Sequence, residues 1–222
     1  MKRNCKPISA AVIAIVAAMT LSGCIQLSDF LPGNGSGSSP EPGGNSTPSA
    51  DPPAGTITDL SFEAGELLSD GARPELGDPF FTDDYWSLTS PDDGNGHWSY
   101  TGNDSLCTLG FTQQLLDSSL TVDGDDRATT DNYLAYVIGV TPEVIAIGAI
   151  DGAVTYGLTG SPERAQTRVI SGAFDDGNHW VISARGFNHA AVGMHLQVVC
   201  APGSDYVSIS NDAFGRISII AF

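Results

Sequence analysis

The side chains in this sequence best suited to acid–base or metal chemistry are the four histidines, His97, His179, His189 and His195. His189 and His195 are six residues apart and would share one face of a continuous strand. With an aspartate they could form a zinc site. Gly193 and an expected turn at Asn188 interrupt that strand. We therefore expect satisfied or exposed histidines rather than metal ligands.

The carboxylates offer a second kind of chemistry, because the chain has 26 Asp and Glu residues. The run Asp123-Gly124-Asp125-Asp126 lacks the alternating ligands and closing Glu of an EF-hand loop. It predicts a solvated loop before a helix, with weak calcium binding as the alternative. Two acids for glycoside hydrolysis, or a Ser/His/Asp triad, could be drawn from these residue types, but no local motif selects the partners.

The motifs missing from the sequence narrow the chemistry further. No lysine follows Lys6, which excludes a P-loop, a Ser-x-x-Lys acylating site and a Schiff-base lysine. HExxH, GxSxG and CxxC do not occur, nor does GxGxxG after a strand. We therefore predict no catalytic residue, no metal ligand set and no cofactor, and the chain is more typical of a non-enzyme.

Two short segments resemble each other: DDGNGHW at 92–98 and DDGNHW at 175–180. Asp, Gly and Asn are typical of tight turns, and a Trp that opens a strand often fills the edge of a core. Two similar hairpins are the favoured interpretation. The alternative is a ligand-binding surface, for example for a glycan, that combines Trp98 and His97 with Trp180 and His179.

The amino terminus has the three parts of an export signal. Lys2, Arg3 and Lys6 precede the apolar run 8–20, which is shorter than the roughly 20 residues that span a bilayer. Leu21-Ser22-Gly23-Cys24 then matches a lipobox, so the chain resembles bacterial lipoproteins. The acidic composition of the part after the signal, which has no lysine, is also similar to that of small actinobacterial lipoproteins.

This resemblance implies that residues 1–23 are a signal peptide and that the Cys24 sulfur carries diacylglycerol. Two or three acyl chains would hold the protein stably in the bilayer, at the outer face of the cell membrane. In a host with two membranes, Ile25 rather than Asp after the cysteine implies the outer membrane. An ordinary secreted protein and a retained transmembrane anchor are the alternatives.

Residues 24–56 are predicted to be the lipidated start and a disordered Gly/Ser/Pro tether, because this segment has almost nothing apolar to bury. A coil of about 28 residues reaches roughly 30 Å.

The part of the chain after the signal is strongly acidic. Once the three basic residues of the signal are removed, six of the nine basic residues remain, all of them arginines, against 26 acidic residues. Such an acidic chain is repelled by phosphate backbones and anionic lipid headgroups, so we predict no nucleic-acid partner.

Residues 57–222 are predicted to form a single globular domain with Cys107 and Cys200 in apolar stretches. Because the compartment is expected to be oxidising, we predict a disulfide between these two cysteines that joins two core strands. Two buried thiols are the alternative.

The residue pattern predicts mostly strands. We expect strands in 98–111 with a break at 102–104, a helix over 130–139 with Thr130 as N-cap, and strands at 168–174, 180–185 and 192–200. We also expect a hairpin of 144–150 and 153–158 around Asp151-Gly152. Residues 210–222 fit either a helix or a last strand.

The predicted fold class is α+β: an antiparallel β-meander with one or two packed helices and one disulfide. This order of elements and the cysteine pair resemble the PsbP-like α+β lipoprotein domains.

The predicted function is a membrane-anchored extracytoplasmic lipoprotein that binds an envelope protein or a ligand without catalysis. Its partners would be the lipid bilayer, through the acyl chains on Cys24, and that unknown envelope component. The alternatives are an envelope hydrolase that uses carboxylates or histidine, and a structural lipoprotein that binds metal weakly.

Overall fold

The computed structural model describes residues 60–63, 65, 67–68, 71–158 and 161–222. The predicted signal peptide 1–23, the lipidation site Cys24 and the tether to residue 56 lie outside the described residues. Within the described part, the chain forms one nine-stranded sheet and three helices. The elements in chain order are β1 (Pro74–Gly77), β2 (Trp86–Ser90), β3 (His97–Gly102), β4 (Cys107–Leu115), α1 (Asp126–Ile138), α2 (Pro142–Gly148), β5 (Ile150–Tyr156), β6 (Arg164–Ala173), β7 (His179–Phe187), β8 (Val192–Cys200), α3 (Tyr206–Arg216) and β9 (Ser218–Ala221).

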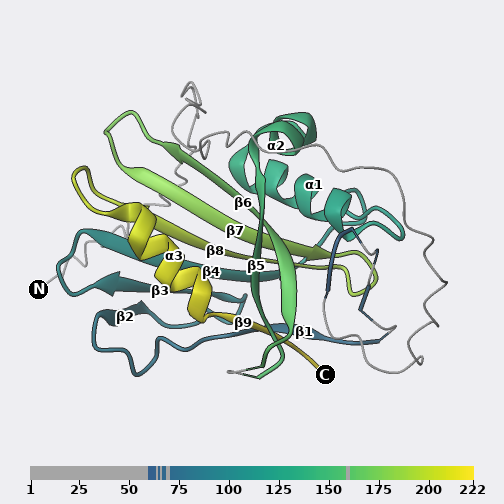
Figure 1. The fold of residues 1–222 in the computed structure, drawn as a ribbon, viewed down its shortest axis with the longest axis horizontal. Coiled ribbons are helices and arrows are strands. Elements are labelled where there is room, and N and C mark those ends of the chain that lie inside the picture. The colour runs from purple at the N-terminus through teal and green to yellow at the C-terminus, as the bar shows by residue number, and fades with distance from the viewer. Residues whose placement is uncertain (1–59, 64, 66, 69–70, 159–160) are drawn as a thin grey trace, which may run out of the picture.

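The sheet curves into a half-barrel and is mostly antiparallel (Figure 1). Its strand order is β1-β9-β5-β6-β7-β8-β4-β3-β2. The pair β5·β9 is parallel, with Thr155 opposite Ser218 and Tyr156 opposite Ile219. The predicted simple meander is therefore wrong, since β8 pairs with β4 across the α1–β7 segment and β9 lies between β1 and β5. An α+β architecture with packed helices and one disulfide is confirmed.

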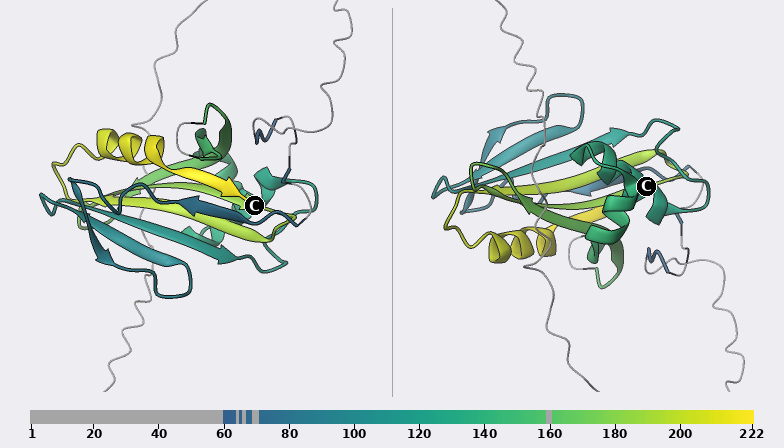
Figure 2. Two further views of the ribbon diagram at one scale, coloured as in Figure 1. Left: turned by 90° about the horizontal axis from the view of Figure 1, so that it is seen from below. Right: turned by 90° about the horizontal axis from the view of Figure 1, so that it is seen from above.

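Helices cover both faces of the sheet. Figure 2 shows α3 on one face and α1 on the other. Strand β7 in the middle is buried along nearly its whole length because both of its faces are covered. Tyr133, Leu134 and Ile145 of α1 and α2 pack on Trp180 and Ile182. We call the sheet face that α3 covers the α3 face. Its core is aromatic near β2, β3 and β4, where it contains Phe80, Trp86, Tyr100 and Phe111.

Several predicted elements are confirmed. The extended segment 98–111 is β3 and β4 with a break between them, and 168–174, 180–185 and 192–200 lie in β6, β7 and β8 apart from residue 174, which follows β6. The predicted helix over 130–139 is α1, but its N-cap is Asp125, whose carboxylate accepts a hydrogen bond from the Ala128 amide. Thr130 is buried inside the helix, where its hydroxyl accepts from the Gly186 amide.

The predicted hairpin around Asp151-Gly152 is wrong. Residues Pro142–Gly148 form helix α2, with Thr141 as N-cap and Pro142 in the first turn, where its missing N–H costs nothing. Asp151 and Gly152 lie inside strand β5, each opposite a residue of β6. The carboxyl-terminal segment contains both of its alternatives, since α3 is followed directly by β9.

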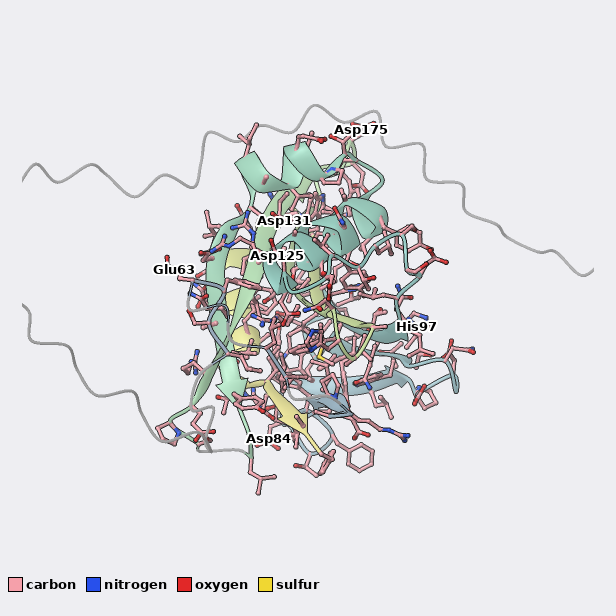
Figure 3. The ribbon with its side chains drawn as sticks, turned by 90° about the vertical axis from the view of Figure 1, so that its right-hand side faces the viewer. Glu63, Asp84, His97, Asp125, Asp131 and Asp175 are labelled. Atoms are coloured by element: carbon pink, nitrogen blue, oxygen red, sulfur yellow. A yellow bond between two sulfur atoms is a disulfide. The ribbon has the colours of Figure 1, made fainter. Side chains whose placement is uncertain are left out.

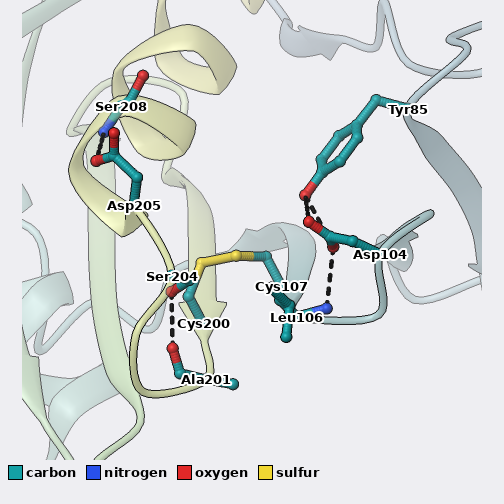
Figure 4. The surroundings of a disulfide bond; sticks show 9 residues. All are labelled: Tyr85, Asp104, Leu106, Cys107, Cys200, Ala201, Ser204, Asp205 and Ser208. Carbon is teal, nitrogen blue, oxygen red and sulfur yellow. Dashed lines mark hydrogen bonds between the residues drawn. A yellow bond between two sulfur atoms is a disulfide. The ribbon is translucent and has the colours of Figure 1, made fainter.

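The predicted disulfide joins Cys107 and Cys200, which lie opposite each other on β4 and β8 with a Cα–Cα distance of 4.1 Å (Figure 4). Both cysteines are buried in the core of the α3 face. The chain that follows Cys200 turns into α3, whose N-cap Asp205 accepts from the Ser208 amide. The bridge therefore fixes the strand end from which α3 begins.

Candidate functional site

The two similar segments of the sequence are both tight turns. Asp92 and Asp93 accept hydrogen bonds from the Gly94 and Asn95 amides, and Asp176 accepts from the Asn178 amide. The structure therefore agrees with the interpretation of the two segments as similar hairpin turns.

The aromatic residues after these turns lie far apart. Trp98 lies on the α3 face, where it stacks on Phe111 with 4.8 Å between ring centroids and donates to Asp78. Trp180 is buried in the core under α1 and α2. Because β4 and β8 lie between β3 and β7, the structure does not bring the two tryptophans together.

The two histidines beside them also have separate partners. His97 is exposed, and its Nδ1 lies 3.1 Å from the Thr112 hydroxyl. His179 stacks on Tyr206 of α3 with 4.3 Å between ring centroids. The four residues of the predicted ligand surface therefore form no common surface.

His195 is the histidine that the structure buries. Its Nδ1 lies 2.7 Å from the hydroxyl of Tyr133 in α1. Burial, with a smaller effect from His97, lowers the pKa of His195 to about 4. The ring is therefore neutral at pH 7 and serves as a packed, hydrogen-bonded core residue.

Two aspartates of α1, Asp126 and Asp131, are engaged in ion pairs. Asp126 is 5% exposed and accepts from Arg185, itself 1% exposed, at 2.7 Å. The same carboxylate accepts from the amide and side chain of Asn188. The prediction of a solvated loop is thus wrong for Asp126, since a sequence window cannot show that an arginine 59 residues away will reach it.

A second ion-pair group lies between α1 and the sheet. Arg168 donates to Asp131 at 2.8 Å and to Asp151 at 2.6 Å, and Arg127 also donates to Asp151. Burial raises the pKa of Asp151, but hydrogen bonds from the two arginines outweigh it and hold the pKa below its ordinary value. Asp151 therefore stays ionised at neutral pH, which makes it a poor general acid.

The acids of the molecule do not converge on one centre. In Figure 3, Asp125 and Asp131 lie along α1, while Asp84, Asp175 and His97 lie at separate places around the molecule. Within the described residues, no group of three or more His, Cys, Asp or Glu side chains could hold a metal ion.

A groove of about 360 Å³ lies between α3 and the strands β5, β6 and β7. Strand alternation and register place Gly152, Thr167, Val169, Val181 and Ser183 on the sheet face that α3 covers. From the helix come Val207, Ser210, Asn211, Phe214 and Gly215. We call this the α3 groove.

Two glycines border the α3 groove from opposite sides. A Cβ on Gly152 would lie 2.7 Å from Val169 Cγ2, so only glycine fits against that side chain. A glycine inside a strand often marks a place where a ligand or another backbone approaches closely. On α3, a Cβ on Gly215 would meet nothing within 4 Å, so space is open beside this helix turn.

Besides the carboxamide of Asn211, the polar groups that line the α3 groove are hydroxyls. The Ser183 hydroxyl donates to Thr167 Oγ1 at 3.0 Å. Ser210 is 2% exposed, and its hydroxyl has no hydrogen-bond partner within the described part of the chain. A buried polar group without a partner is costly and calls for an explanation. The arrangement, an apolar groove with a few hydroxyls, is typical of small-molecule sites.

A second hollow of about 500 Å³ lies on the other side of α3, beside Asp83, Asp84 and Tyr85. Arg216 pairs there with Asp83 and Asp212 and lies over the ring of Phe80. Its charged groups are largely matched with each other, and it has none of the buried unpaired polar atoms found in the described residues. The α3 groove is therefore the stronger candidate.

Sequence reasoning missed the α3 groove because its residues come from four elements. The signal for it in the sequence is Gly152, an isolated glycine that the pattern around it assigns to a turn.

The chain matches no protein-family model and no curated protein in sequence. None of the helices in the described residues is both long enough and apolar enough to cross a membrane.

Proposed function

We propose that this chain is a lipid-anchored binding module at the outer face of the cell membrane, and that the α3 groove takes a small, largely apolar ligand. The lipobox at 21–24 supports the anchor. The α3 groove supports the binding role, and it is the observation on which the proposal depends.

The α3 groove suits binding better than catalysis. Its Ser183 hydroxyl is bonded to another hydroxyl instead of to a base, and its floor is built from valine and phenylalanine side chains. Its volume is at the lower end of the roughly 300–1,000 Å³ typical of ligand pockets. A molecule with a single alkyl chain or two small aromatic ring systems is the expected size of ligand.

The binding role can be tested with the neutral fluorophore N-phenyl-1-naphthylamine and the full chain carrying Cys24→Ala. We expect saturable binding of one probe per chain, with a rise in fluorescence as water is excluded. Gly215→Phe adds a ring where the α3 groove has open space, and should weaken binding by about tenfold or more.

The matched control is Ser208→Phe. Ser208 lies on the same helix but lines the hollow beside Asp83 instead of the α3 groove. This variant should bind the probe like the parent. Equal weakening in both variants, or none in Gly215→Phe, would place the probe elsewhere and overturn the proposal.

The anchor is tested separately, by growth of expressing bacteria with labelled palmitate. The wild-type chain should carry the label and sediment with membranes, whereas Cys24→Ala should carry none. Unchanged membrane attachment of an unlabelled Cys24→Ala chain would contradict lipid anchoring.

A further inference from the structure

We infer that the ligand of the α3 groove is an uncharged amphipath, an alkyl chain that ends in a hydroxyl or carbonyl group. This inference rests on the proposed function and adds the chemical class of the ligand. Two features of the groove point to it: the direction of the charged side chains around the groove and the state of its hydroxyls.

The two charged residues that line the α3 groove direct their side chains away from it. Asp151 lies opposite Arg168 in the sheet and is paired with Arg168 and Arg127 on the α1 face. Arg164 alternates with the core residue Ala165 and donates to Ala153 O and Thr155 Oγ1. Neither charge is therefore available to a ligand head group inside the groove.

The other side chains that line the groove are apolar, carry hydroxyls or, in Asn211, carry a neutral carboxamide. Val169, Val181 and Phe214 would contact the alkyl chain. An ionised head group would lose its hydration here without gaining a counter-charge, which is strongly unfavourable. A neutral head group avoids that cost.

Ser210 supplies the expected contact for a neutral head group. Ser210 lines the α3 groove, and its buried hydroxyl has no partner among the described residues. A hydroxyl both donates and accepts, so it can pair with a ligand hydroxyl or carbonyl. The bonded pair of Ser183 and Thr167 lies on the opposite wall, on the sheet, and can extend the same contact.

The test compares three molecules with the same decyl chain, namely 1-decanol, decanoate and decylammonium, by displacement of the naphthylamine probe at pH 7. Decanol should displace the probe at a concentration at least about tenfold lower than either ion, since only the ions lose hydration uncompensated. Ser210→Ala should weaken decanol by about two- to tenfold, the value of one hydrogen bond, and leave the affinity for the probe unchanged.

The results separate two failures. If decanoate or decylammonium displaces the probe as well as decanol does, the assignment of a neutral ligand is overturned while the α3 groove remains a binding site. The same conclusion follows if Ser210→Ala weakens the three molecules equally. If the probe itself does not bind, or if Gly215→Phe has no effect on it, the proposed function fails first.

Discussion

At the scale of single residues, His195 predicts how stability depends on pH. Its pKa in the folded chain is about 4 against an ordinary 6.5, so between these values the unfolded chain binds a proton that the folded chain does not. Stability is therefore retained above about pH 6.5 and falls by up to about 3 kcal/mol as the pH drops to 4.

Urea unfolding at several pH values between 7 and 4.5 checks this. His195→Gln should flatten the slope in this window, because it removes the group whose pKa differs between the folded and unfolded chain. The pKa values of Asp83 and Asp151 are lowered, so these carboxylates take up protons only below about pH 4. They therefore do not change the stability between pH 7 and 4.5. An unchanged slope in His195→Gln would show that this ring is not buried and neutral.

Asp126 predicts a large loss of stability. Asp126→Asn should lower the free energy of unfolding by about 3–5 kcal/mol, because Arg185 would keep its buried charge without a counter-charge. Asp123→Asn, at an exposed neighbour, should stay within about 0.5 kcal/mol of the parent. Thermal unfolding of the two variants measures the difference, and a small effect at Asp126 would mean that water reaches the pair.

Residue chemistry could be predicted from the sequence only where the partners are local. The aspartates of both Asp-Asp-Gly-Asn segments bond to amides within four residues, and the turns were predicted correctly. Asp126 and His195 depend on partners 59 and 62 residues away. No pattern in a short window carries that information.

At the scale of elements, α3 and β5 offer a comparison of two glycines. Gly215→Ala should raise the free energy of unfolding by up to about 1 kcal/mol, because alanine favours the helix and its methyl group has open space. Gly152→Ala should lower it by about 1–3 kcal/mol, because the new methyl group overlaps Val169. Urea unfolding of both variants tests these signs, and stabilisation by Gly152→Ala would show that the β5 wall of the α3 groove is not closely packed.

The type of an element could be predicted where its pattern is regular. Strands β6, β7 and β8 follow apolar runs separated by turn residues, and α1 has apolar residues at helical spacing. The run at 144–148 is apolar and short, and such runs fit a strand or a helix equally well. Thr141 as N-cap followed by Pro142 is a helix start signal, and the segment forms a helix. The prediction of a strand gave more weight to the apolar character of the run than to this signal.

At the scale of the whole molecule, the disulfide ties β4 to β8 across a sequence separation of 93 residues. On the chain-entropy model, a loop of about this length contributes up to roughly 4–5 kcal/mol, and measured values usually lie between about 2 and 5. The double variant Cys107→Ala/Cys200→Ala should therefore have a clearly lower midpoint of thermal unfolding. A midpoint equal to that of the parent would contradict a structural role for the bridge.

The cysteines also mark the limit of what could be predicted about topology. Two cysteines in apolar runs predicted that their strands meet, and this is confirmed. The positions of β1 and β9 depend on the pairing of β9 with β1, near the start of the described chain, and with β5 in its middle. The α3 groove likewise combines α3 with β5, β6 and β7, an arrangement that no short stretch of sequence predicts.

The most direct test of the account is to locate a bound neutral amphipath by NMR. Decanol is titrated into the isotope-labelled full chain carrying Cys24→Ala, and the backbone amide shifts are recorded. Decanol bound in the α3 groove should give the largest shifts on β5, β6, β7 and α3, around Val169, Val181 and Phe214, and these shifts should be lost in Gly215→Phe. Shifts centred on the hollow beside Arg216 or on α2, or no shifts at saturating decanol, would contradict it.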